Sequence, residues 1–136
     1  TLYNKALKHF GDLKGKKFAM WGLSFKPNTD DMREAPALTL IDLFTKAGAE
    51  IIGYDPVAME ECKRRVGDKI QYTEKPYEAL QDVDALLLVT EWSEFRVLDY
   101  ERMSGMKEKV IIDGRNIYTP QEVRDHGFTY YSIGRK

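Results

Sequence analysis

Short runs of apolar residues recur along the chain, and each is separated from the next by a stretch of different rhythm. Five runs have the length and composition of β-strands: residues 16–21 (KKFAMW), 50–54 (EIIGY), 84–90 (DALLLVT), 109–113 (KVIID) and 128–132 (FTYYS). Residues 69–72 form a weaker sixth candidate. The segments LLLV and VII are apolar without alternation, which is typical of strands that are covered on both faces.

The segments between these runs carry apolar residues at helical spacing. One helix is expected after Pro36, which suits a first helical position, and Gly48 stands where a helix usually ends. A second is expected over residues 59–66 (MEECKRRV), with the pairs Glu60–Arg64 and Glu61–Arg65 at i,i+4 spacing on its outer face. Shorter helical candidates cover residues 76–80, 98–106 and 120–125.

Strand and helix alternate from about residue 15 to the end of the chain. This order predicts an α/β fold with three layers, in which a mostly parallel sheet of about six strands lies between helices. In such sheets ligands bind beyond the carboxyl ends of the strands, near the point where the strand order reverses. The loops after Trp21, Thr90 and Asp113 are therefore the places to search for a site.

Composition restricts the class of protein further. The chain has 136 residues, which is the size of one ordinary domain, and a formal net charge of -1 with acids and bases interspersed. A nucleic-acid surface would show a clustered basic excess, and the apolar runs are far too short to span a bilayer. One cysteine and two distant histidines make an internal disulfide impossible and a zinc site improbable. We expect a cytoplasmic domain without nucleic-acid or membrane partners.

The loop after the first strand, GLSFKPNTDDMREAP, is rich in charge but holds a single glycine, Gly22. A dinucleotide-binding turn needs several close glycines, so Asp55, placed where a ribose-binding acid would stand, is a weak match. The loop offers cations instead: Lys26 follows the strand end, and Arg33 precedes a helix start, where unpaired N–H groups favour anions. The alternative is that both cations pair with Asp30 and Asp31 on the surface.

A second cation follows the fifth strand, in the sequence DGRN at residues 113–116. Gly114 permits a tight turn there, and Arg115 projects beyond the strand end. Two cations from neighbouring strand ends can converge on one anionic ligand. A turn with an exposed arginine is the other interpretation that the residues allow.

Four motifs in this order resemble a known family. GKKFAMWGLSFKPNTDDMREAP at residues 15–36, YDP at 54–56, TEW at 90–92 and DGRN at 113–116 are similar to the C-terminal domain of the UDP-glucose/GDP-mannose dehydrogenase family, most closely to bacterial members that act on UDP-glucose. The resemblance extends from about Asp12 onward. It implies a Rossmann-like domain, residues 12–136, preceded over residues 1–11 by the end of a helix that links it to other domains.

The resemblance also implies an activity and a set of binding residues. Family enzymes oxidise the C6 hydroxyl of UDP-glucose twice with two NAD+, giving UDP-glucuronate; an N-terminal domain binds NAD, and a central region forms a homodimer. The family's FK motif contacts the UDP-sugar, which carries over to Phe25 and Lys26. The arginine of its DGR motif does so too, which carries over to Arg115. The arginine of its DxRE segment reaches NAD, which carries over to Arg33.

Some family features are missing or altered. The serine that often precedes the helix is Ala35 here, so this helix is expected to lack a side-chain cap. The glycine-rich motif with the nucleophilic cysteine, the catalytic lysine and the dinucleotide fingerprint do not occur in these residues. Cys62 shares a helix face with Met59 and Val66, and we interpret it as a buried structural thiol. We therefore assign no catalytic residue and expect the piece to be inactive alone.

Other residues and other functions were weighed against this interpretation. Trp21 and Trp92 lie at strand ends, where packing is favoured over stacking on a base. Glu91 and Asp113 are interpreted as loop anchors rather than as acid–base groups. Alternative functions are the same domain of a GDP-mannose or UDP-N-acetylhexosamine dehydrogenase, or a stand-alone nucleotide-binding module.

Overall fold

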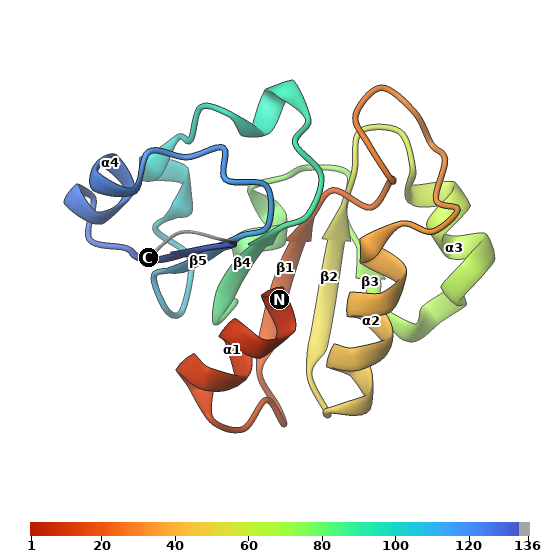
Figure 1. Ribbon diagram of the computed structural model, residues 1–136, viewed down its shortest axis with the longest axis horizontal. Coiled ribbons are helices and arrows are strands. Elements are labelled where there is room, and N and C mark those ends of the chain that lie inside the picture. The colour runs from red at the N-terminus through yellow and green to blue at the C-terminus, as the bar shows by residue number, and fades with distance from the viewer. Residues whose placement is uncertain (134–136) are drawn as a thin grey trace.

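The computed structural model describes residues 1–133. Within this part of the chain, six strands form one parallel sheet in the order β3-β2-β1-β4-β5-β6, seen in Figure 1. The strands are β1 Lys17–Trp21, β2 Glu50–Tyr54, β3 Gln71–Tyr72, β4 Ala85–Leu88, β5 Val110–Asp113 and β6 Thr129–Ser132. This confirms the predicted α/β fold, and every strand pair is parallel rather than most of them.

Helices connect the strands on both sides of the sheet. The α-helices are α1 Leu2–Phe10, α2 Pro36–Lys46, α3 Met59–Val66 and α4 Pro120–Asp125, and the short 3-10 helices are η1 Gly67–Lys69, η2 Glu78–Leu80, η3 Ser93–Phe95 and η4 Tyr100–Met103. The helices expected over residues 76–80 and 98–106 are thus only 3-10 turns. Each segment has too few apolar positions to bury a helical face, which an α-helix needs to offset the cost of its first turn.

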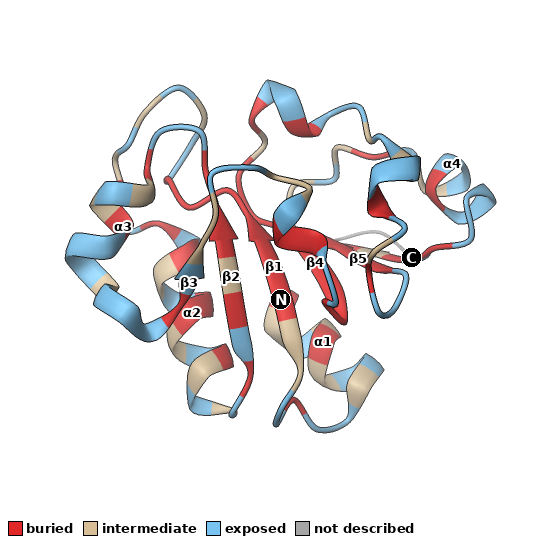
Figure 2. Ribbon diagram, turned by 180° about the vertical axis from the view of Figure 1, so that it is seen from behind, coloured by how far each residue is buried: buried red, intermediate tan, exposed pale blue. Residues whose placement is uncertain are grey.

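Two hydrophobic cores lie on the two faces of the sheet. Successive side chains of a strand point to opposite faces, so Phe18 and Met20 of β1 join the core beneath α1, α2 and α3. Ala19 and Trp21 join the second core, beneath η2, η3, η4 and α4. The central strands β1, β4 and β5 are accordingly buried along nearly their whole length, as seen for β1 and β4 in Figure 2, while the outer faces of the helices are exposed. This double coverage explains why LLLV and VII lack alternation.

The first helix belongs to the layered structure. Leu2 and Ala6 of α1 are buried and pack in the same core as α2. Figure 1 shows α1 beside α2 across the same face of the sheet. The expectation that residues 1–11 are the end of a linker helix remains a prediction. In the structure, α1 packs on the sheet as part of the helical layer.

Helix ends and surface pairs agree with the sequence in most details. Ala35 precedes α2 and makes no side-chain hydrogen bond to the helix, as expected for an alanine there. On α3, Arg65 donates to Glu61 over 2.8 Å, which confirms one predicted i,i+4 pair. The other prediction was wrong: Arg64 pairs with Glu61 at i,i+3, 3.1 Å away, rather than with Glu60. Glu61 binds both guanidinium groups at once, one at each carboxylate oxygen.

The strand order reverses between β1 and β4. Because β1 pairs with β2 on one side and with β4 on the other, the chain runs outward in both directions from this point. The loops that follow the strands all leave from the same edge of the sheet, since the strands are parallel. The three loops singled out from the sequence therefore share one edge of the molecule, near the reversal of strand order.

Candidate functional site

The loop after β1 is fastened by a buried carboxylate on a different strand. Asp55, directly after β2, is fully buried and accepts hydrogen bonds at its Oδ2 atom from the backbone N–H of Leu23 (2.7 Å) and of Ser24 (3.2 Å) and from the indole Nε1 of Trp92 (3.0 Å). Its Oδ1 atom accepts the N–H groups of Val57 (2.9 Å) and Ala58 (2.8 Å). One carboxylate thus joins the loops after β1, β2 and β4.

This arrangement decides the question of a dinucleotide site in the first loop. A ribose-binding acid must present its oxygens to two hydroxyl groups of the ligand. Both oxygens of Asp55 are instead occupied by donors of the protein itself, and only Gly22 is available for close approach of a pyrophosphate. The residues of this turn do not fit the principal NAD site. Asp55 positions the loop and is not a cofactor ligand.

Gly22 has a different reason to be glycine. Its φ is +96°, and a Cβ atom there would lie 2.4 Å from both the Cβ and the backbone N of Thr90. The backbone of the loop after β1 therefore lies directly against Thr90 in the loop after β4, which leaves no room for a side chain at position 22. The hydroxyl of Thr90 adds a bond of 2.7 Å to the carbonyl oxygen of Ser24. Gly22 is therefore required for close packing between two loops of the protein, which is a structural role.

A second buried carboxylate builds the turn that carries Arg115. Asp113, the last residue of β5, accepts the backbone N–H groups of Arg115 and Asn116 at one oxygen, each at 2.8 Å. Its other oxygen accepts the N–H groups of Ile117 and Tyr118 and, at 2.7 Å, the hydroxyl of Tyr130. This confirms the interpretation of Asp113 as a loop anchor. Its oxygens are occupied by these donors, so it does not act as an acid–base group.

Arg115 links the turn after β5 to both other loops. Its Nε donates to the carbonyl oxygen of Val89 and its Nη2 to that of Phe25, each over 3.0 Å. Phe25 lies 90 positions earlier in the chain. The two bonds fix the plane of the guanidinium group. The sequence-predicted residues Phe25 and Arg115 are therefore brought together.

Phe25 and Lys26 lie at the tip of this arrangement. The backbone N–H of Phe25 donates to the carbonyl oxygen of Asp31 over 2.7 Å, which closes the loop on itself. Phe25 is 43% exposed. Lys26 is exposed beside it. An exposed aromatic ring next to a cation and close to Arg115 is suited to a ligand with both a flat face and negative charge.

Arg33 pairs with Asp31 on the surface, which is the alternative that the sequence allowed for this arginine. Its Nε and Nη2 donate to the two carboxylate oxygens of Asp31 over 3.1 and 3.0 Å. The hydrogen bonds from Arg33 lower the pKa of Asp31 to about 2. The Arg33 side chain is nonetheless 80% exposed, so the pair lies in water and can be exchanged for another anion at small cost. Asp30 is exposed and has no such role.

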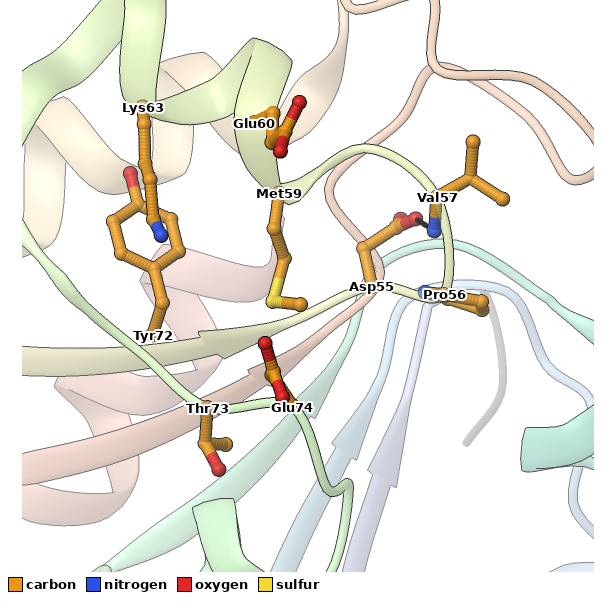
Figure 3. Close-up of a pocket in the computed structure, with 9 residues that line it drawn as sticks. All are labelled: Asp55, Pro56, Val57, Met59, Glu60, Lys63, Tyr72, Thr73 and Glu74. Carbon is orange, nitrogen blue, oxygen red and sulfur yellow. Dashed lines mark hydrogen bonds between the residues drawn. The ribbon is translucent and has the colours of Figure 1, made fainter.

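One cavity of the protein does not contain any of the predicted binding residues. It has a volume of about 460 Å³ and lies beyond the ends of β2 and β3. Its lining residues, drawn in Figure 3, are Asp55, Pro56, Val57, Met59, Glu60, Lys63, Tyr72, Thr73 and Glu74. Lys63 lies over the ring of Tyr72, with its ammonium 5.0 Å from the ring centre. Lys63, the cation among these lining residues, is thus in contact with Tyr72, and the negative charges of Glu60 and Glu74 disfavour an anionic ligand in this cavity.

The remaining candidates from the sequence have structural places. Cys62 is fully buried, and burial raises the pKa of its thiol, so a thiolate is disfavoured. Trp21 and Trp92 are buried too, and the Trp21 ring stacks on Phe95 at 4.8 Å between centres. Over residues 1–133 no cluster of three or more His, Cys, Asp or Glu side chains has a metal-binding arrangement, and no helix there is long and apolar enough to cross a membrane.

Sequence reasoning missed one member of the site, the backbone. The groups that hold the guanidinium of Arg115 include two carbonyl oxygens, of Val89 and Phe25, which every residue type carries. No side-chain pattern can reveal them. A Rossmann-like sheet with cations gathered at its carboxyl edge, beside the reversal of strand order, defines the class: an open α/β domain of the nucleotide-binding type.

Comparison with known proteins identifies the family within this class. The sequence profile of the UDP-glucose/GDP-mannose dehydrogenase family, UDP binding domain, matches residues 19–120, and the chain belongs to this family. The chain is 48% identical over 126 residues to the UDP-glucose 6-dehydrogenase of Rhizobium meliloti (strain 1021), covering 92% of the chain and 29% of that relative. The chain therefore spans less than a third of the length of this relative.

Solved structures give the same fold. A UDP-glucose dehydrogenase from the hyperthermophilic archaeon Pyrobaculum islandicum is similar with a TM-score of 0.84 and 30% identity, covering 99% of this chain and 29% of that one. The NDP-N-acetyl-D-galactosaminuronic acid dehydrogenase from Methanosarcina mazei Go1 is similar with a TM-score of 0.81 and 31% identity, covering 99% and 28%. Both matches take in the whole layered structure, α1 included.

Proposed function

We propose that this chain is the UDP-sugar-binding, C-terminal domain of an NAD-dependent UDP-glucose 6-dehydrogenase, which oxidises UDP-glucose to UDP-glucuronate with two NAD+. Membership of the family and 48% identity to one such enzyme support the proposal. The domain comprises residues 12–136, of which 134–136 lie outside the described residues, and α1 is the end of the linker helix. The other partners are the remaining domains of a cytoplasmic homodimer, which bind most of the NAD.

One observation carries the proposal for the site: Arg115 is held by carbonyl groups of two other loops, one of them Phe25 of the FK motif. A guanidinium group fixed in this way offers its outer N–H donors to a planar or paired set of oxygens. A diphosphate presents such oxygens. The neighbouring Lys26 supplies a second, compact charge for the same ligand.

The proposed roles follow from what each side chain exposes. Phe25 presents its ring, Lys26 its ammonium and Arg115 its guanidinium to the UDP-sugar. Arg33 is farther along the loop and exposed, and its partner Asp31 can be replaced by a phosphate of NAD bound to another domain. A diphosphate that neutralises these cations would hold the domain against the rest of the enzyme. Such closure would also exclude water from the reacting carbon.

This chain contributes binding groups and no reacting group. Its cysteine is buried with a raised thiol pKa, and the carboxylates at the strand ends, Asp55 and Asp113, are filled by N–H and O–H donors. We therefore propose that the hydride transfer and the covalent chemistry belong to the other domains. The chain alone is expected to show no turnover.

Full-length enzyme with single substitutions tests the assignment. Lys26→Ala and Arg115→Ala are expected to raise the KM for UDP-glucose about 10- to 100-fold, since each removes a charged hydrogen bond to the ligand. Arg33→Ala should raise the KM for NAD+ instead. Lys107→Ala is the matched control, because this exposed lysine precedes β5 at the opposite edge of the sheet. NADH formation is the readout, and an unchanged KM in Arg115→Ala would contradict the site.

A second candidate differs only in the sugar. The NDP-N-acetyl-D-galactosaminuronic acid dehydrogenase of Methanosarcina mazei is nearly as similar as the UDP-glucose dehydrogenase of Pyrobaculum islandicum, with TM-scores of 0.81 and 0.84 and 31% and 30% identity. UDP-N-acetylhexosamines carry the same diphosphate and uracil, so the cations described above would bind either substrate. Comparing kcat/KM of the full-length enzyme for UDP-glucose, UDP-N-acetylmannosamine and GDP-mannose distinguishes them. The proposal requires UDP-glucose to give the highest value.

A further inference from the structure

Glu91 places a carboxylate against the cation of the proposed site. It follows β4, and its Oε2 atom lies 3.7 Å from the Nε of Arg115, with the two side chains only 27% and 30% exposed. The other oxygen, Oε1, is shielded from solvent, and no hydrogen-bond donor among residues 1–133 reaches it. A half-buried carboxylate with an unbonded oxygen is an uncommon arrangement, because carboxylate oxygens normally find donors.

Glu91 does not determine where Arg115 lies. The Nε and Nη2 groups of Arg115 are already bonded to two backbone carbonyls at 3.0 Å. The separation of 3.7 Å from Glu91 is longer than an N–H···O hydrogen bond. What Glu91 adds to Arg115 is therefore negative charge rather than orientation.

Negative charge at this position weakens the attraction of the site for anions, and the effect grows with the charge of the ligand. The diphosphate of a nucleotide-sugar is a diester with one negative charge on each phosphate. A free nucleoside diphosphate ends in a phosphate monoester, whose second ionisation falls near pH 6, so it carries roughly one further charge at neutral pH. The carboxylate thus opposes the free nucleotide more than the nucleotide-sugar.

We propose that Glu91 is a specificity-determining residue: it makes the Arg115 site favour a nucleoside diphosphate sugar over the free nucleoside diphosphate. The inference rests on the proposed function, since it requires Arg115 to meet the diphosphate. It adds a discrimination that the cations alone do not provide. Lys26 and Arg115 by themselves attract the more highly charged ligand more strongly.

Calorimetric titration of the full-length protein with UDP and with UDP-glucose, without NAD, measures this discrimination. Glu91→Gln keeps the shape of the side chain and removes its charge. It is expected to tighten UDP binding about 3- to 10-fold and UDP-glucose binding less, so that the ratio of the two Kd values moves by about threefold toward UDP. The shift should diminish as salt is added.

Three variants serve as controls. Glu91→Asp retains the charge and should still favour UDP-glucose over UDP, as the parent protein does. Glu91→Ala, uncharged and smaller, should move the ratio in the same direction as Glu91→Gln. Glu108→Gln removes an equal charge from an exposed residue before β5, at the opposite edge of the sheet, and should leave the ratio unchanged.

The outcomes separate this inference from the proposed function. If Arg115→Ala weakens both ligands while Glu91→Gln and Glu91→Ala leave the ratio unchanged, only the role of Glu91 is overturned. The same holds if Glu108→Gln moves the ratio equally, or if neither uncharged variant folds, because Glu91 would then be a structural residue. If Arg115→Ala weakens neither ligand, the proposed site fails, and the role of Glu91 fails with it.

Discussion

Asp55→Asn is expected to destabilise the chain by about 3–5 kcal/mol, a large part of the 5–15 kcal/mol typical of a domain. The carboxylate is fully buried and accepts five N–H donors between 2.7 and 3.2 Å. These donors come from the loops after β1, β2 and β4. An amide side chain of nearly the same size can accept at only one of its two positions.

The magnitude follows from counting donors at each oxygen. If the amide nitrogen replaces Oδ2 it faces three N–H groups, and if it replaces Oδ1 it faces two. The less costly orientation still leaves two donors unbonded, the buried N–H of Ala58 at about 1–3 kcal/mol and the partly buried N–H of Val57 at the lower end of that range. The three remaining bonds also lose the strength that a charged acceptor gives. The sum is about 3–5 kcal/mol.

Urea unfolding followed by circular dichroism measures this change. The urea concentration at the unfolding midpoint should fall, while the dependence of the unfolding free energy on urea concentration stays constant. The melting temperature should fall by about 10–15 °C for a domain of this size. Asp68→Asn, at an exposed position in η1, is the matched control and should change stability by less than about 0.5 kcal/mol. A loss below about 1 kcal/mol in Asp55→Asn would refute the conclusion that this carboxylate fastens three loops.

Three further predictions concern other features of the structure. Gly22→Ala should cost about 2–4 kcal/mol in urea unfolding, because its Cβ would lie 2.4 Å from Thr90 at a φ of +96°. Nuclear magnetic resonance titration of Asp31 should give a pKa of about 2, so that its contribution to folding stability is complete above pH 3.8 and is lost as pH falls through 2. Cys62 should resist a thiol reagent until the chain unfolds, since it is buried and its pKa is raised.

Each of these predictions has a control and a contrary outcome. Gly67→Ala has a positive φ but open space around it, so it should cost about 1 kcal/mol, and an equal loss in both glycine variants would argue against the clash. In Arg33→Ala the pKa of Asp31 should return toward 3.8, and no return would contradict the pairing. If the thiol reagent labelled Cys62 in the folded chain as fast as in the urea-unfolded chain, that result would contradict the burial of Cys62.

The sequence was sufficient for the fold and for the choice of loops. Alternating apolar runs and helical stretches have few parallel arrangements open to them, and continuous runs such as LLLV require cover on both faces. Cations directly after strand ends must lie at the carboxyl edge, which is how Lys26 and Arg115 were selected. The short segments at residues 76–80 and 98–106 were assigned less well, because apolar spacing over so few residues does not distinguish an α-helix from a 3-10 turn that buries the same side chains.

Only the tertiary structure decided which groups engage one another. Asp55 reaches Leu23 and Trp92, 32 and 37 positions away, and Arg115 reaches Phe25 across 90 positions. These contacts depend on which strand lies beside which, and several of their partners are backbone atoms that carry no residue identity. The sequence by itself therefore placed the charged side chains at one edge of the sheet, whereas the packing of the loops determined that the oxygens of Asp55 and Asp113 accept hydrogen bonds from the protein and that Arg115 is bonded to the carbonyl groups of Val89 and Phe25.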